Sequence, residues 1–176
     1  MYIALYIILS IIVIVLILGL LAPKHYEVNR SIVVNKPISE VFNYLKYVKN
    51  QDDWSPWKKK DPDMIQTFEG TDGEVGFVSK WVGNKDVGEG EQEIKRIVEN
   101  ESIETELRFL KPWESQSDAY IRVVALENQQ TNVTWGFSGK NKFPFSIFML
   151  FMNMDKAVGK DFEEGLNSLK QQLEKS

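Results

Sequence analysis

Residues 131–173 read TNVTWGFSGKNKFPFSIFMLFMNMDKAVGKDFEEGLNSLKQQL, and they join two segments of different periodicity. In the first segment apolar residues alternate with small or polar ones, which predicts a strand with one apolar face. In the second segment apolar residues recur every three or four positions, as they do along the buried stripe of a helix. We therefore predict a strand over residues 131–138 and a long helix over residues 145–173.

Further short segments upstream have the character of strands, because they are rich in β-branched and aromatic residues and end in turn residues. These segments are residues 26–34, 64–68, 77–82, 88–98, 102–110 and 119–126. Short polar connections between the later ones favour an antiparallel meander, and a helix that opens at residues 36–39 follows the first. The predicted fold class is α+β, with a curled antiparallel sheet wrapped around the long C-terminal helix.

The N-terminal stretch differs from the rest of the chain. Residues 2–22 read YIALYIILSIIVIVLILGLLA and carry no charge. A helix of ~21 residues is ~30 Å long, which matches the hydrocarbon core of a bilayer. We therefore predict one transmembrane helix, with residues 1–23 as an anchor and residues 24–176 as a single domain. Pro23 ends the apolar run.

A cleaved signal peptide is the alternative for this stretch. Such a peptide has a basic start, a shorter apolar core and a small-residue cleavage site, whereas no Lys or Arg precedes this apolar run. Lys24, His25 and Arg30 follow it instead, and positive charge on that flank favours a cytoplasmic domain. We expect a single-pass protein of the cell membrane.

The composition excludes several classes of function. The chain has no cysteine and one histidine, so it lacks a disulfide framework, a thiolate nucleophile and a multi-histidine metal centre. A formal charge of -4 argues against a general nucleic-acid-binding protein, which needs a basic face. We expect no metal, no other cofactor and no nucleic-acid partner.

Several local strings resemble the START/polyketide-cyclase superfamily, also called helix-grip or SRPBCC proteins. They are residues 37–42 (PISEVF), 54–57 (WSPW), 61–62 (DP), 81–84 (WVGN), 88–90 (GEG), 134–139 (TWGFSG), 159–162 (GKDF) and 165–166 (GL). The resemblance covers nearly all of residues 26–175 and is closest to bacterial polyketide cyclase/dehydrase-like members, some of which have an N-terminal membrane helix. It implies a hydrophobic cavity between sheet and long helix, and it carries no universal catalytic motif.

Aromatic and methionine side chains are the predicted lining of that cavity. Flexible methionines suit an adaptable pocket as well as plain core packing, and both uses stay open for the helix residues. Tryptophans in a loop serve either as a lid over a cavity mouth or as the end of the core. The apolar candidates for ligand binding are Trp54, Trp57, Trp81, Phe109, Trp135, Phe148 and Met152.

Two charged residues complete the candidate set. Asp155 lies at the edge of the apolar stripe, where a carboxylate that faces a cavity would have a raised pKa and act as an acid or base. The alternative is a solvated residue that pairs with a lysine. Arg122 lies within an apolar strand; it either points inward to anchor a ligand or lies on the solvated face of the sheet.

The leading functional hypothesis is a membrane-tethered, monomeric module that binds a hydrophobic small molecule or lipid. An anchor keeps such a domain close to ligands that dissolve in the membrane. The alternative is a cyclase or dehydratase-type enzyme that acts on a polyketide-like substrate, and a domain with a filled core and no ligand is a third class. The residues do not identify a catalytic group.

Overall fold

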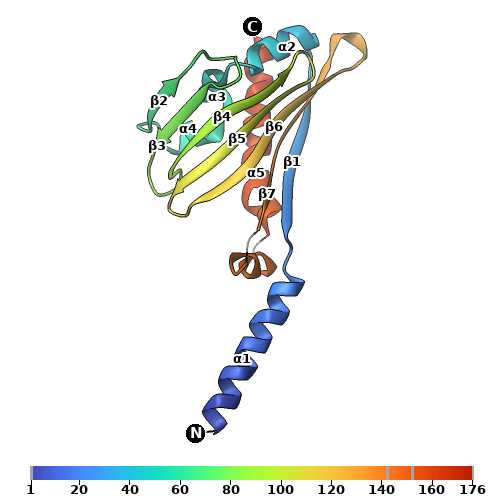
Figure 1. Ribbon diagram of the computed structural model, residues 1–176. Helices are drawn as coiled ribbons and strands as arrows, with labels where there is room; N and C mark the ends of the chain where they lie inside the picture. The colour runs from blue at the N-terminus through green and yellow to red at the C-terminus, as the bar shows by residue number, and fades with distance from the viewer. Residues whose placement is uncertain (1, 142, 152, 176) are drawn as a thin grey trace.

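A computed structural model describes residues 2–141, 143–151 and 153–175, and it shows a lone helix followed by one domain (Figure 1). The lone helix, α1 (Tyr2–Leu21), has no buried residue. Within the described ranges it is the one helix long and apolar enough to cross a membrane, a property that signal sequences near an N-terminus share. The prediction of a long apolar helix is confirmed.

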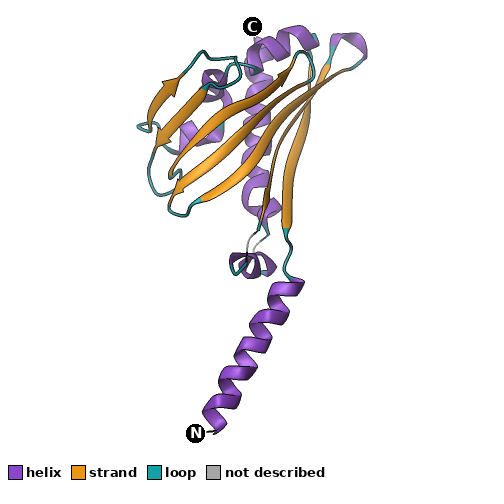
Figure 2. Ribbon diagram, in the orientation of Figure 1, coloured by secondary structure: helices purple, strands orange, loops and turns teal. Residues whose placement is uncertain are grey.

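The domain is built on one antiparallel sheet whose spatial order is β1-β7-β6-β5-β4-β3-β2. Its strands are β1 (His25–Val34), β2 (Ile65–Glu69), β3 (Val78–Val82), β4 (Glu89–Val98), β5 (Ser102–Lys111), β6 (Ser115–Ala125) and β7 (Thr131–Lys140). Strands β2 to β7 form a meander, and β1 closes it by pairing with β7, with His25 opposite Lys140. The sheet curls around the C-terminal helix (Figure 2), so the predicted α+β fold is confirmed.

Helices cover the concave face of the sheet. They are α2 (Ile38–Leu45), η1 (Val48–Asn50), α3 (Gln51–Trp54), α4 (Pro56–Lys60) and α5 (Met154–Lys175), while η2 (Glu127–Gln129) and η3 (Phe145–Leu150) are short 3-10 turns in connections. Pro37 precedes α2, whose buried face is Val41, Phe42 and Leu45. Two short helices, α3 and α4, hold the tryptophans that were expected in a loop, and α3 brings Trp54 into the interior.

The core lies between the sheet and α5. The buried stripe of α5 consists of Phe162, Leu166, Leu169 and Leu173, together with two glycines. Helix and sheet are close at these glycines, because a methyl group at Gly165 would lie 2.7 Å from the ring of Trp135. From the strands, the core contains Val28, Val34, Ile103, Ala119, Ile121, Val123, Val133, Trp135 and Phe137.

The final helix begins later than predicted. Residues 145–150 form η3, and α5 starts at Met154. The side chain of Asn153 explains this start, because its Oδ1 accepts a hydrogen bond of 3.0 Å from the backbone N–H of Lys156. An asparagine that accepts this bond is a helix N-cap, which fixes the first turn of α5 and separates it from η3.

Candidate functional site

The interior between sheet and α5, where a cavity was predicted, contains stacked aromatic rings. The ring centroids of Trp135 and Phe162 are 4.1 Å apart with planes 9° from parallel. Trp54 meets Trp135 edge-on at 4.9 Å, and Phe137 lies against Phe162 at 5.7 Å. Trp54 is only 1% exposed, so its position is that of a core residue and not of a lid.

A small pocket remains beside these rings. Its volume is about 10 Å³, which is about the space that one water molecule needs. Its lining residues are Gln51, Gln92, Ile103, Thr105, Ala119, Tyr120, Ile121 and Trp135. A ligand of the size of a lipid or polyketide would enter there only if one of the indole rings moved.

The other predicted apolar residues do not gather in one place. Trp81 and Phe109 contact each other edge-on at 6.0 Å on the concave face, and both are half-buried. Trp57 is half-buried in α4, with the ammonium group of Lys60 4.4 Å from its ring centroid. Contacts therefore join Trp54 to Trp135 and Trp81 to Phe109, as two separate pairs.

Three further predicted positions have different outcomes. Phe148 belongs to η3 and is 63% exposed, so its expected place inside the sheet-and-helix interior is wrong. Arg122 lies exposed on the convex face, with its guanidinium 4.1 Å from the ring centroid of Tyr120; the inward orientation is also wrong. Met152 lies outside the described residues.

A larger pocket, here called the junction pocket, lies where α1 meets the domain. Its volume is about 510 Å³ and it is open to solvent. Its lining residues are Pro23, His25, Tyr26, Glu27, Asn141, Met149, Leu150, Phe151, Asn153, Met154 and Asp155. They come from the connection between α1 and β1, the start of β1, the residue after β7, η3 with the residue that follows it, and the N-cap and first turn of α5. The break between η3 and α5 is thus what shapes this pocket.

Hydrogen bonds fix the pocket beside the end of α1. The backbone N–H of Asn141 donates to the carbonyl of Lys24 at 2.9 Å, and its side-chain amide donates to the carbonyl of Pro23 at 3.0 Å. The residue that leaves β7 is therefore tied to the segment that joins α1 to β1. This contact keeps η3, which follows in the chain, next to the helix.

One ion-pair cluster connects the junction pocket to β1 and to the next turns of α5. The guanidinium of Arg30 in β1 donates two hydrogen bonds to the carboxylate of Asp155, at 2.7 and 3.0 Å. Its Nε donates to Glu163 at 2.6 Å. Arg30 shares the concave face with Val28 and Ile32, which stand two positions away on either side. It therefore lies across α5 at Gly159.

The electrostatics of this cluster exclude the acid role considered for Asp155. The hydrogen bonds from Arg30 hold the pKa of Asp155 below its ordinary value, and the pKa of Arg30 is raised by the same partners. A carboxyl group with a lowered pKa is ionised at neutral pH and has no proton to donate. Asp155 is thus an exposed, paired carboxylate, with an arginine in place of the expected lysine.

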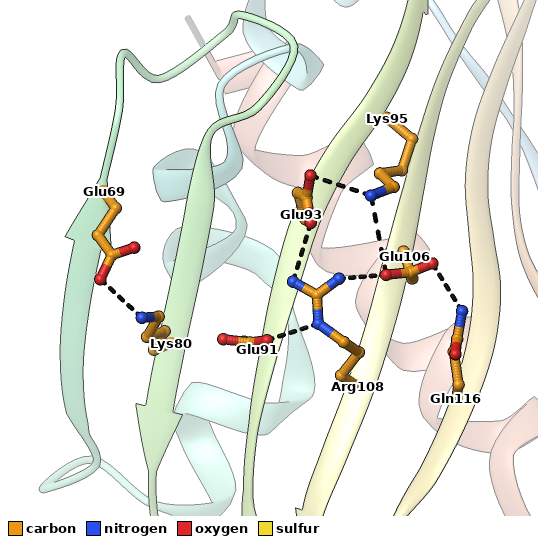
Figure 3. A network of polar contacts seen from close by, with 8 residues as sticks. All are labelled: Glu69, Lys80, Glu91, Glu93, Lys95, Glu106, Arg108 and Gln116. Carbon is orange, nitrogen blue, oxygen red and sulfur yellow. Dashed lines mark hydrogen bonds and ion pairs between the residues drawn. The ribbon is translucent and has the colours of Figure 1, made fainter.

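The convex face of the sheet is polar, and its charges are paired both within and across strands (Figure 3). Arg108 contacts Glu91, Glu93 and Glu106, and Lys95 bridges Glu93 and Glu106. Lys95 and Arg108 lower the pKa of Glu93. Such cross-strand pairs are typical of a sheet face that meets water. Within the described ranges, no three His, Asp or Glu side chains are grouped to hold a metal ion.

Two features of the junction pocket were missed in the sequence, although signals for both exist. The alternation of β1 places Arg30 on the apolar face, where an arginine needs a carboxylate partner. Asn153 stands immediately before the regular part of the final stripe, which is an N-cap signature. The N-cap signature at Asn153 indicates that Asp155 is in the first turn of a new helix, and Arg30 is the partner that its carboxylate meets there.

No protein-family model and no curated protein sequence matches the chain. Solved structures do match. A protein of unknown role from Rhizobium leguminosarum is 16% identical with a TM-score of 0.60, and the match covers 87% of this chain and 97% of that one. The crystal structure of Ara h 8.0201 is 12% identical with a TM-score of 0.59, and the match covers 86% of this chain and 99% of that one.

The Aha1 dimer from Colwellia psychrerythraea is similar in the same way. It is 18% identical with a TM-score of 0.53, and the match covers 84% of this chain and 96% of that one. Identities this low establish architecture and leave function to be argued from the site. A seven-stranded antiparallel sheet that curls around a long C-terminal helix is what these proteins share with the present chain, which therefore has a helix-grip fold preceded by a long apolar helix.

Proposed function

We propose that this chain is a membrane-tethered module that binds a hydrophobic small molecule or lipid in the junction pocket. The proposal keeps the class of function that was predicted from the sequence. That prediction drew on the resemblance to polyketide cyclase/dehydrase-like proteins with a membrane helix. It moves the site from the sheet-and-helix interior to the foot of the domain. Among the predicted site residues that the structure describes, Asp155 is the one that lines the new position.

The position of the junction pocket carries the proposal. A 20-residue helix such as α1 is ~30 Å long, which is the thickness of the hydrocarbon core. Pro23, two residues beyond Leu21, lines the pocket. A bilayer crossed by α1 would therefore have its headgroups at the level of the pocket, where a membrane-dissolved molecule reaches it without crossing water.

The chemistry of the pocket suits an amphiphile. Met149, Leu150, Phe151 and Met154 supply apolar surface to the lining. The polar lining consists of His25, Glu27, Asn141, Asn153 and Asp155. The volume lies within the ~300–1,000 Å³ typical of small-molecule sites, and methionines adapt to guests of different shape. A ligand with an apolar chain and a polar end fits a lining that contains both apolar and polar side chains.

A substitution that fills the pocket tests the site. Full-length protein in lipid nanodiscs is titrated with a fluorescent fatty-acid analogue, and Met149→Trp is compared with Leu126→Trp at the opposite end of the domain. We expect Met149→Trp to weaken binding at least tenfold, or ~1.4 kcal/mol, and Leu126→Trp to leave it unchanged. Equal binding by both variants contradicts the proposed position.

A second variant tests whether the ligand binds in the interior between the sheet and α5 instead. Ala119 lines the small pocket beside Trp135, so Ala119→Leu blocks any ligand that opens this interior and leaves the junction pocket untouched. Loss of probe binding in Ala119→Leu, with normal binding in Met149→Trp, would return the site to the predicted cavity. A wild-type protein that binds no amphiphilic probe would contradict the proposal and favour the third class, a domain with a filled core and no ligand.

The tether is tested on protein isolated from membranes. We expect the mature chain to retain residues 1–22 and the basic flank at Lys24 to face the cytoplasm. N-terminal sequencing checks the first point, and protease protection of membrane vesicles checks the second. A mature protein that starts after Ala22 would replace the anchor with a signal peptide.

A further inference from the structure

Large apolar side chains are exposed at the end of the domain next to α1. On and around η3 they are Phe143, Phe148, Leu150 and Phe151, which are 58%, 63%, 38% and 81% exposed. At the end of β5 and in the turn that leads to β6 they are Leu110 and Trp113, at 51% and 74%. We call these six residues the apolar foot. Soluble monomers rarely expose aromatic residues together in this way.

The foot is continuous with α1. The ring of Phe143 packs against Gly19, where an added methyl group would lie 2.9 Å from it, so η3 touches the last turn of the apolar helix. In Figure 1, η3 lies beside the domain end of α1, and the β5–β6 turn is at the lower end of the sheet, on the same side of the domain. Both parts of the foot therefore face the region that α1 enters.

The residue types of the foot and its rim match a membrane–water interface. Phenylalanine and tryptophan side chains partition to the headgroup level of bilayers. Two basic residues lie at the rim, since Lys24, just before β1, and Lys140, at the end of β7, are both exposed. Lys111, beside the β5–β6 turn, is paired with Glu89 at 2.8 Å. Exposed lysines at this level attract anionic lipid headgroups.

We infer that the apolar foot lies in the headgroup layer of the same bilayer that α1 crosses, so that the domain is docked on the membrane and not suspended above it. The inference rests on the tether proposed above and adds a second, independent membrane contact. Because η3 supplies Met149 and Leu150 to the junction pocket, and Phe151 follows directly, docking orients one wall of the pocket toward lipid. The ligand class is then a membrane-resident amphiphile that enters sideways from the lipid leaflet.

The absence of cysteine makes a site-specific test direct. Single-cysteine variants Phe151→Cys and Trp113→Cys of the full chain receive an environment-sensitive fluorophore, and Leu126→Cys at the far end of the domain is the matched control. All three positions are exposed, so labelling leaves the core intact. Each labelled protein is placed in nanodiscs that contain anionic lipid, and its intact mass establishes that residues 1–23 are present.

The readout is quenching by nitroxide groups on the lipid headgroups and by iodide in water. We expect lipid nitroxides to quench labels 151 and 113 several-fold more than label 126, with the reverse order for iodide. Labels 151 and 113 that are as accessible to iodide as label 126 would overturn the docking and leave the tether intact. Disulfide formation between two Phe151→Cys chains would also overturn it, because a second copy would then cover the foot.

Discussion

The indole ring of Trp135 on β7 lies flat against the phenyl ring of Phe162 on α5, with centroids 4.1 Å apart. This stack joins the sheet to the helix at the centre of the domain, and Trp54 closes it edge-on. The interior of this helix-grip domain is therefore occupied by its own aromatic side chains. The same three rings stabilise the domain by their burial and fill the space in which a ligand was expected.

Truncation of the stack gives the first prediction. Phe162→Ala removes a ring that is 4% exposed and should lower the free energy of unfolding by ~3–5 kcal/mol. Phe151→Ala, at a residue that is 81% exposed, should change it by less than ~0.5 kcal/mol. Urea unfolding of the full chain in detergent, followed by near-ultraviolet circular dichroism, measures both. Similar losses in the two variants would contradict the burial described here.

The indole N–H of Trp54 gives the second prediction. Its Nε1 is buried and has no hydrogen-bond partner among the described residues, and an unsatisfied buried donor costs ~1–3 kcal/mol. Trp54→Phe removes the donor and keeps most of the ring, so we expect it to cost less than ~1.5 kcal/mol. Trp54→Ala should cost ~3–5 kcal/mol. A Phe variant as unstable as the Ala variant would show that the N–H has an essential partner.

Close packing at Gly165 gives the third prediction. Alanine is the better helix former by ~1 kcal/mol, yet a methyl group here would lie 2.7 Å from the ring of Trp135 and 3.1 Å from Pro56. We expect Gly165→Ala to destabilise the domain by ~1–3 kcal/mol. Asn167→Ala, at an exposed position of the same helix, should be nearly neutral in the same unfolding assay. A stabilised Gly165→Ala would mean that the sheet moves aside.

The pairing of Arg30 with Asp155 gives a pH-dependent prediction. The hydrogen bonds from Arg30 lower the pKa of Asp155 in the folded state, so the ionised carboxylate stabilises the fold at neutral pH. This contribution is lost as the pH falls below ~4 and through the lowered pKa. Carbon-13 NMR of the carboxyl group should give a midpoint below 3.8.

A double-mutant cycle is the control for this pH dependence. Asp155→Asn should lower the free energy of unfolding at pH 7 in wild type and have no effect in an Arg30→Gln background, because the partner is then absent. The difference between wild type and Asp155→Asn should shrink at acid pH. An Asp155→Asn effect that persists unchanged without Arg30 would show that another group holds the carboxylate.

The order of elements was predictable because two periodicities are clear along the chain. Alternation in residues 102–110 and 131–138 predicts strands with one inner face, and the spacing from Phe162 to Leu173 predicts the helix that covers them. All three are present. Residues 2–22 were equally clear, since an uncharged and almost wholly apolar run of this length is typical of a membrane-spanning helix.

The candidate site was harder to predict. In residues 143–154, which are rich in Phe and Met, the apolar residues do not recur at a helical or strand spacing that would separate buried from exposed positions. Phe148 and Phe151 suggest burial by their chemistry, but the N-cap at Asn153 ends η3 before it can continue α5 into the core. Which rings fill the interior depends on side-chain rotamers and close packing. Residue spacing predicts the face on which Trp135 and Phe162 lie, but it does not predict that their rings stack.

The pairing of β1 with β7 also sets an order of events during synthesis. His25 lies opposite Lys140, so the first strand leaves the ribosome roughly 6–23 s before its partner at the usual rate of translation. The meander of β2 to β6 can form in that interval, while β1 stays unpaired next to α1. Completion of the domain is therefore the last step of its biogenesis, and it takes place with the chain's apolar helix already made.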